Sequence, residues 1–226
     1  MIAKIKNGIK VRSIAYKNKL YAKLYGLNSK KYWDYRFKNN WQNLNGRLQS
    51  MMFAAGFTSL DYKFENINSI LDFGCGLADS IPVLKSKFNK SELFFYDFSE
   101  SAMEIASKYY GKYASSYNLE QNKSFDLVYC SNVIEHITDK DINVFLDSIF
   151  KATKKYVVIQ APYNETWENG EPLTENTPRS EHVRTLNKDI INLFNEIDPN
   201  IQWEMITKMV PYAWDLTEQV FYIGKK

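Results

Sequence analysis

The chain has 226 residues, 45% of them hydrophobic, which suits one well-packed domain with an appendage. No apolar run approaches the ~20 residues needed to cross a bilayer, and the charged N-terminal segment lacks the apolar core of a signal peptide, so a cytoplasmic protein is expected. The two cysteines, Cys75 and Cys130, form no C-x-x-C pair and are expected to be small buried residues rather than a disulfide framework.

The net charge of +3 is distributed unevenly along the chain. Residues 1–38 hold eleven Lys or Arg and one acidic residue, for +10, whereas the rest holds 18 basic and 25 acidic residues, for −7. Apolar residues fall at roughly helical spacing among the early lysines, namely Ile2, Ile5, Ile9, Ile14, Leu20 and Leu24. This pattern suits peripheral contact with anionic lipid or an acidic ligand, and equally a solvated helix that packs its apolar stripe on the body.

Helices are expected through residues 1–60, as an extension, and alternating strands and helices through residues 61–226. Apolar runs predict strands at 69–74, 92–97, 125–131 and 155–161, helices at 79–88, 100–111, 139–152 and 187–196, and a terminal pair of strands in QWEMITKMVP and TEQVFYIGK. The segment between Tyr110 and Lys123 gives no clear strand signal. Alternation of this kind predicts right-handed crossovers and a parallel sheet, with ligands at the carboxyl ends of the strands.

The segment ILDFGCGLADS, residues 70–80, joins an apolar strand to a glycine turn. Gly74 and Gly76 allow the backbone to approach a ligand closely, and Asp72 stands two residues before the first glycine. A second apolar run ends at Asp97, 21 residues after Gly76, where a carboxylate can bind both hydroxyls of a ribose. The pair predicts a site for a nucleoside-containing cofactor.

Charge discriminates between the cofactors that such a turn can bind. A dinucleotide places a pyrophosphate at the helix N-terminus, where Asp72 would repel it, and Asp79 occupies the place of the third glycine of G-x-G-x-x-G. S-adenosylmethionine has no phosphate, and its α-ammonium favours an acidic partner. An NAD(P)-dependent oxidoreductase and a non-catalytic S-adenosylmethionine-binding protein remain alternatives.

At these residues the chain resembles the class I S-adenosylmethionine-dependent methyltransferases, with Ala78 in place of the last glycine of their first motif. SFDLVYCSNVIEHI, residues 124–137, resembles the fourth strand and following motif of that family, KKYVVIQAPY its fifth strand, and the terminal strand pair its closing hairpin. The resemblance covers about residues 68–226. It implies a Rossmann-like α/β fold with a seven-stranded, mostly parallel sheet, an antiparallel C-terminal strand, and helices on both faces.

The resemblance also implies a set of cofactor-binding residues. The methionyl part of S-adenosylmethionine is expected at the turn residues Asp72, Gly74, Cys75 and Gly76. The ribose is expected at Asp97, with Phe98 and Ser131 nearby, and Tyr117 or Asn118 is a candidate contact for the adenine. KYWDYRF, residues 31–37, is similar to leader segments of bacterial small-molecule and surface-glycan methyltransferases, so three of its residues are expected to fold over the cofactor: Tyr32, Trp33 and Arg36. The same segment equally suits an aromatic helix packed as core.

Catalytic candidates follow from the proton that an oxygen acceptor must lose. A histidine is the natural base at neutral pH, and the chain has two, His136 after the fourth expected strand and His182 before the last expected helix. Glu135 beside His136 completes the predicted catalytic set. Asn132, Glu135, His136 and His182 are similar in order to the metal ligands of small-RNA 2′-O-methyltransferases, but Asn132 replaces a glutamate, and no divalent metal is expected.

The predicted acceptor is a small molecule, which can be phosphorylated or nucleotide-linked, such as a surface-polysaccharide precursor. Ser131-Asn132-Val133-Ile134 is neither the Asn/Asp-Pro-Pro-aromatic motif of exocyclic-amine methyltransferases nor the Pro-Cys of cytosine-C5 enzymes, so nucleic acid is not expected as the acceptor. An RNA 2′-O-methyltransferase remains an alternative. The polar stretch 163–186 is either an acceptor-binding loop or a surface insertion. The oligomeric state is left open.

Overall fold

The computed structural model describes the chain except residues 1, 43–44, 164–181, 185 and 213–214. Its sheet has seven strands in the order β3-β2-β1-β4-β5-β7-β6. The strands are β1 (Ser69–Phe73), β2 (Glu92–Tyr96), β3 (Ser115–Ser116), β4 (Phe125–Ser131), β5 (Thr153–Pro162), β6 (Gln202–Tyr212) and β7 (Asp215–Lys225). Strands β1 to β5 pair in parallel and β7 pairs antiparallel with β5 and β6, which confirms the predicted Rossmann-like sheet.

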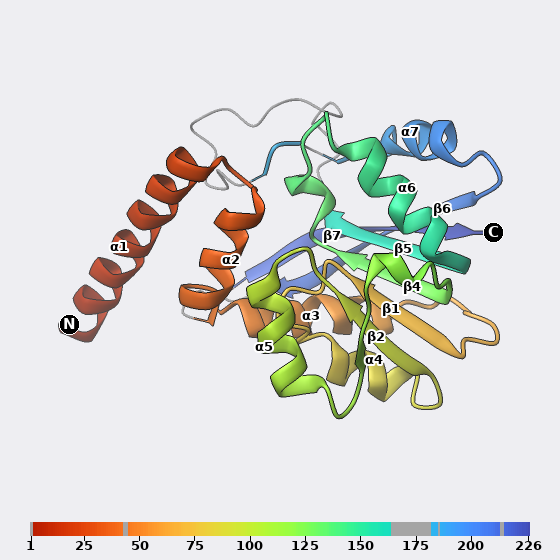
Figure 1. Cartoon of the computed structure of the whole chain (residues 1–226), viewed down its shortest axis with the longest axis horizontal. Coiled ribbons are helices and arrows are strands. Elements are labelled where there is room, and N and C mark those ends of the chain that lie inside the picture. Colours follow the sequence, from red (N-terminus) through yellow and green to blue (C-terminus); the bar gives the residue numbers. More distant parts are fainter. Residues whose placement is uncertain (1, 43–44, 164–181, 185, 213–214) are drawn as a thin grey trace.

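Helices cover both faces of this sheet (Figure 1). On one face lie α6 (Ile142–Ala152) and α7 (Ile190–Ile197), and on the other α3 (Gly46–Thr58), α4 (Ile81–Lys87) and α5 (Glu100–Tyr110). Successive residues of a strand point to opposite faces, so Ile70 of β1 joins the core beneath α3 and α4 while Leu71 joins the core beneath α6 and α7. Because helices cover both faces of the sheet, β1 and β4 are mostly apolar in sequence rather than alternating between apolar and polar residues.

Helices α1 (Ile2–Tyr25) and α2 (Lys30–Asn39) lie outside these layers (Figure 1). Helix α2 is held at the start of α5, where Asp34 accepts hydrogen bonds from the Ser99 hydroxyl at 2.6 Å and the Ser101 backbone N–H at 3.1 Å. Helix α3, in contrast, packs on the sheet, where a Cβ on Gly56 would lie 2.7 Å from Val210. The division of the chain at residue 60 stays a prediction.

The weak strand signal before Lys123 has a physical explanation. Strand β3 contains two serines, both exposed, and pairs with β2 only through Phe94↔Ser115 and Phe95↔Ser116. Two short 3-10 helices, η2 (Leu119–Gln121) and η3 (Ile134–His136), follow β3 and β4. Both cysteines are buried free thiols, as expected. Among the residues that the structure describes, no helix combines the length and apolarity needed to cross a membrane.

Candidate functional site

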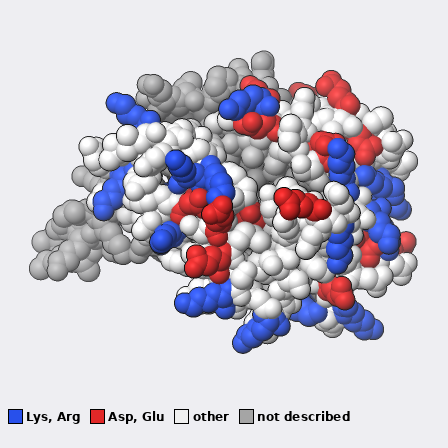
Figure 2. Space-filling model, in the orientation of Figure 1, with Lys and Arg blue, Asp and Glu red and all other residues white. Residues whose placement is uncertain are grey.

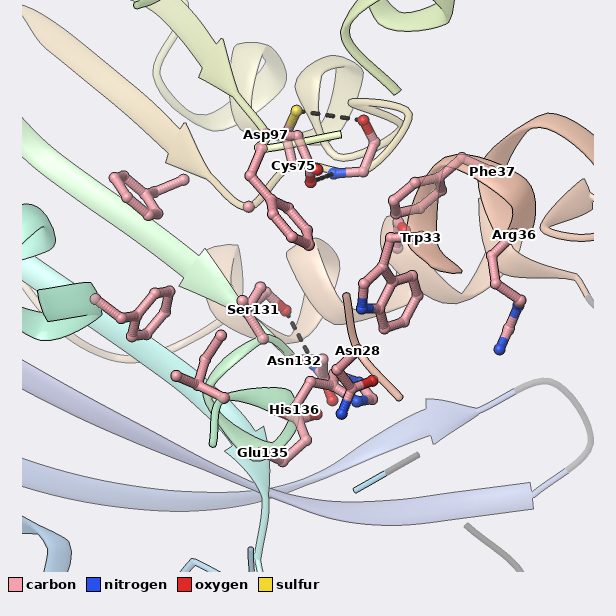
Figure 3. Close-up of a pocket in the computed structure, with 18 of the residues that line it drawn as sticks. Asn28, Trp33, Arg36, Phe37, Cys75, Asp97, Ser131, Asn132, Glu135 and His136 are labelled. Carbon is pink, nitrogen blue, oxygen red and sulfur yellow. Dashed lines mark hydrogen bonds between the residues drawn. The ribbon is translucent and has the colours of Figure 1, made fainter. Parts of the chain in front are cut away.

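A cavity of about 1000 Å³ opens at the carboxyl ends of β1, β2 and β4. In Figure 3, Cys75 and Asp97 lie at one end of it, Ser131 and His136 lie at the other, and Trp33 reaches in from α2. The cavity is where a doubly wound sheet binds its ligands. Both segments that the sequence singles out, the glycine turn and the stretch after β4, line this cavity.

The glycine turn is shaped by backbone conformations that L side chains rarely adopt. Gly74 has φ +75° and Gly76 has φ +54°, and Ala78, in the place of a third glycine, also has a positive φ of +58°. The Gly74 N–H donates to the Tyr96 carbonyl at 2.8 Å, which fixes the turn to the end of β2. A Cβ on Gly76 would lie 3.0 Å from the Phe37 ring, so the turn also sits directly under α2.

Asp97 connects the turn to the start of α5. Its buried carboxylate accepts hydrogen bonds from the backbone N–H groups of Gly76 and Ser99, each at 2.9 Å. Burial raises the pKa of Asp97 to about 6, so the group is mainly ionised at neutral pH. A carboxylate offers about four acceptor positions, which leaves two for ribose hydroxyls. Phe98, beside it on the cavity wall, is 45% exposed and presents a ring face to a ligand.

Asp72 lies at the cavity wall beneath the turn and accepts a hydrogen bond from the Ser80 hydroxyl. Burial, with a smaller contribution from the charge of Asp97, raises the pKa of Asp72 to about 7 despite the Ser80 bond. The group is therefore near half-ionised at neutral pH, and a cationic ligand would favour its charged form. Burial raises the pKa of the neighbouring Cys75 well above its usual range, which keeps that side chain a thiol.

Helix α2 begins where the Ser29 hydroxyl accepts the Tyr32 backbone N–H at 3.2 Å, and it supplies one side of the cavity. Trp33 stands edge-on to His136, with ring centroids 5.1 Å apart. Arg36 also lines the cavity, although it is only 5% exposed, and donates to the Tyr32 hydroxyl at 3.1 Å. Tyr32 itself is buried behind Arg36 and is not among the cavity-lining residues. Its place suits holding Arg36 rather than touching a ligand.

The three predicted catalytic residues come together at the far end. The Val183 N–H donates to the Glu135 carbonyl at 2.8 Å, and Arg184 donates to the Ile137 carbonyl at 3.0 Å. These bonds fix the segment before α7 on η3, so the rings of His136 and His182 lie 4.9 Å apart. Ligand atoms of Glu135, His136 and His182 all lie within 4.8 Å of one another.

His136 is neutral throughout the physiological range. Burial and the positive charge of Arg36 lower its pKa to about 3. A neutral imidazole has one unprotonated nitrogen, which is the atom that can accept a hydrogen bond or a proton. The same Arg36 charge opposes a divalent cation at the Glu135, His136 and His182 cluster, although a carboxylate with two histidines is a suitable ligand set for one.

The sequence analysis missed a buried amide network beneath this end of the cavity. Gln160 accepts from the Tyr129 hydroxyl at 2.6 Å and the Ser131 hydroxyl at 3.3 Å, and Gln219 accepts from the Asn132 amide at 3.3 Å. Both glutamines are fully buried. A signal was present for Gln160, a polar residue within the apolar run YVVIQAP, because buried polar groups need a partner, whereas Gln219 follows Thr217 and Glu218 and gives no such signal.

Two other contacts differ from the sequence-based view. Tyr117, a candidate contact for the adenine, is buried in the core and donates a hydrogen bond to the Lys123 carbonyl at 3.2 Å. Asn118, the other candidate, caps η2. Of this segment, Leu119 is the residue that lines the cavity. The candidate acceptor loop 163–186 lies largely outside the described residues.

Residues 71–156 match a family model described as a methyltransferase domain. No curated protein matches. Solved structures are similar in fold at low identity. The plantazolicin methyltransferase BpumL in complex with SAH is 15% identical over 95% of this chain and 99% of that one, with a TM-score of 0.59. Magnesium protoporphyrin IX methyltransferase from Synechocystis PCC 6803 with bound SAM is 15% identical over 82% and 84%, with a TM-score of 0.52.

An O-methyltransferase family protein from Burkholderia thailandensis is 10% identical, with a TM-score of 0.59, and covers 84% of this chain. The chain spans 61% of that protein's length. The family match spans the glycine turn, Asp97 and the segment ending in His136, all of which contribute to the cavity wall. The chain therefore contains a segment that matches a methyltransferase domain and has the fold of S-adenosylmethionine-dependent methyltransferases, which supports S-adenosylmethionine as its cofactor.

Proposed function

We propose that the protein transfers a methyl group from S-adenosylmethionine to an oxygen atom of a small-molecule acceptor. The proposal is carried by the position of His136, a neutral imidazole on the wall of the cavity that the glycine turn and Asp97 also line. An oxygen acceptor loses a proton as it is methylated, and this imidazole can accept that proton. When bound, S-adenosylmethionine supplies the methyl group as an electrophilic carbon on a positively charged sulfur.

The residues at the cofactor end have separate roles in the proposal. Asp97 would hold the ribose hydroxyls, and Asp72 would favour the α-ammonium through its charge. Arg36 would pair with the methionyl carboxylate. Trp33 and Phe37, both largely buried against the turn, would exclude water from the reacting groups. Each role follows from a side chain that already lines the cavity.

The low pKa of His136 constrains the acceptor. A base works best when its pKa lies near the working pH, and a value of about 3 is low for that purpose. Part of the shift comes from Arg36, so an anion bound near Arg36 would raise the pKa of His136. The cofactor carboxylate is one such anion. A phosphorylated or nucleotide-linked acceptor, such as a surface-polysaccharide precursor, would be another.

The size of the cavity supports a small acceptor. About 1000 Å³ is at the upper end of small-molecule sites, which leaves room for an acceptor beside the cofactor. Beyond the histidines, the acceptor side is lined by amides and hydroxyls, including Asn28, Ser131, Asn132 and Gln219. Such groups suit a polar, hydroxyl-bearing molecule.

The test is methyl transfer from labelled S-adenosylmethionine into the small-molecule fraction of a cell extract. We expect the label in an O-methyl ether or ester, and transfer by His136→Ala that is about 10²–10⁴-fold slower with unchanged affinity for S-adenosylhomocysteine. His136→Gln, which keeps a hydrogen-bonding group without a base, should be equally slow. Label on nitrogen or carbon, or full transfer by either variant, would contradict the proposal.

A further inference from the structure

One side of α1 is committed to the protein body. Ile14 and Asn18 are buried. The side-chain amide of Asn40 donates a hydrogen bond to the side-chain oxygen of Asn18 at 2.8 Å. One turn further, the Tyr21 ring stacks on Tyr35 with centroids 3.6 Å apart. These residues recur every three to four positions and so form a single face of the helix.

The opposite side of α1 carries large apolar residues with no described cover. Tyr16, Leu20 and Leu24, here called the outward stripe, are 71%, 44% and 63% exposed. Their spacing of four residues places them along one line, turned away from Ile14 and Asn18. The apolar residues at helical spacing in α1 thus divide into two faces, one packed and one open to solvent.

Basic residues flank the outward stripe. Lys17, Lys19 and Lys23 are all exposed on α1, and the sequence has no acidic residue before Asp34. Figure 2 shows basic side chains and no acidic ones on the described part of the α1 end of the molecule. The outer surface of α1 therefore combines apolar side chains with uncompensated positive charge.

We propose that α1 lies on an anionic lipid surface, with the outward stripe among the head groups and upper acyl chains and the three lysines on lipid phosphates. Apolar residues flanked by lysines on a helix surface are the features of an interfacial helix. A nucleic acid would bind the lysines through its phosphates but would leave Leu20 and Leu24 in water, so the leucines favour lipid.

This placement has a consequence for the site. Tyr25, the last residue of α1, and residues 26–29 after it line the cavity. A helix lying on lipid would therefore bring this part of the cavity wall close to the membrane surface. The inference concerns the binding of α1 itself and does not depend on which acceptor the cavity holds.

The test is flotation of the full-length protein with vesicles of phosphatidylcholine alone or mixed with phosphatidylglycerol. We expect binding to the mixed vesicles that weakens with added salt, and little binding to the neutral ones. Leu20→Glu/Leu24→Glu and Lys17→Gln/Lys19→Gln/Lys23→Gln should each reduce binding by about tenfold or more. Tyr109→Glu is the matched control, because Tyr109 is on α5 and as exposed as Leu24, and it should bind like the wild type.

Affinity for S-adenosylhomocysteine, measured on every variant, separates loss of lipid binding from loss of folding. Equal binding of the wild type to both kinds of vesicle would overturn the proposal, as would unchanged binding by the Leu20→Glu/Leu24→Glu variant. An α1-dependent dimer that the same variant dissociates in the absence of lipid would also overturn it, because the stripe would then belong to a second copy. Tighter α1-dependent binding to RNA than to the mixed vesicles would also overturn the proposal.

Discussion

The two ends of the cavity are built in different ways. The cofactor end is local: the glycine turn and Asp97 lie within 26 residues of one another, and backbone N–H groups hold both in place. The histidine end is assembled from distant segments, with His136 after β4, His182 before α7 and Arg36 on α2. Local geometry is prescribed by a short motif, whereas the distant arrangement depends on how the whole chain packs.

Replacing Asp97 with alanine should weaken the cofactor end most. The change removes a carboxylate that accepts two backbone N–H groups and has room for two ribose hydroxyls. We expect affinity for S-adenosylhomocysteine to fall by about 1–3 kcal/mol, measured by titration calorimetry. Asp97→Asn, which keeps one acceptor oxygen, should lose less. Equal affinity of wild type and Asp97→Ala would remove the residue from the ribose site.

The difference between the ends also explains what the sequence could predict. The glycine turn and Asp97 follow from short spacings, and the positions of β1, β2, β4 and β5 follow from apolar runs and were placed within a few residues. Strand β3 was not, because its pairing depends on β2 rather than on its own two serines.

At the histidine end the sequence points to residues that the structure brings together, but not to their surroundings. It identified His136 and His182 as candidates, yet the charge that lowers the pKa of His136 comes from Arg36, 100 residues earlier. The support of Ser131 and Asn132 by Gln160 and Gln219 requires β5 and β7 to be neighbours. Such contacts between distant segments leave only weak traces in local pattern.

A pH titration can test the electrostatics of the cofactor end. Burial raises the pKa of Asp72 to about 7 and that of Asp97 to about 6, from an ordinary 3.8. Cofactor binding favours both charged forms, so affinity for S-adenosylhomocysteine should fall as the pH drops through 7 and 6, by about tenfold or more between pH 8 and pH 5. Calorimetry should also detect proton release near pH 7.

The same pKa shifts predict how the stability of the protein without cofactor depends on pH. Between pH 3.8 and about 7 the folded protein binds more protons at these carboxyls than the unfolded chain, so their contribution to stability falls as the pH rises through that window. Asp72→Asn should remove part of both effects. A cofactor affinity that does not vary between pH 5 and pH 8 would contradict the assignment of these groups to the site.

The contact between the turn and α2 can be broken by one methyl group. Gly76→Ala forces a side chain into φ +54° and places its Cβ 3.0 Å from the Phe37 ring. We expect a loss of about 1–3 kcal/mol in the free energy of unfolding, measured by denaturant titration. Gly26→Ala is the matched control: its φ is +88° but the nearest contact is 3.9 Å, so only the backbone strain of about 1 kcal/mol applies. Equal losses would show that Phe37 does not pack on the turn.

The smallest expected effect is that of a chelator on the histidine end. Glu135, His136 and His182 lie close enough to hold a divalent ion, but Arg36 places a positive charge near His136, and the charge that disfavours a proton there also disfavours a cation. We expect methyl transfer to be unchanged after dialysis against EDTA and after addition of Mg²⁺, Mn²⁺ or Zn²⁺. Activity lost to EDTA and restored by one of these ions would contradict this view. His182→Ala sharpens the test, because a role in binding metal predicts that this variant loses metal affinity and activity together, whereas a role beside His136 changes activity alone.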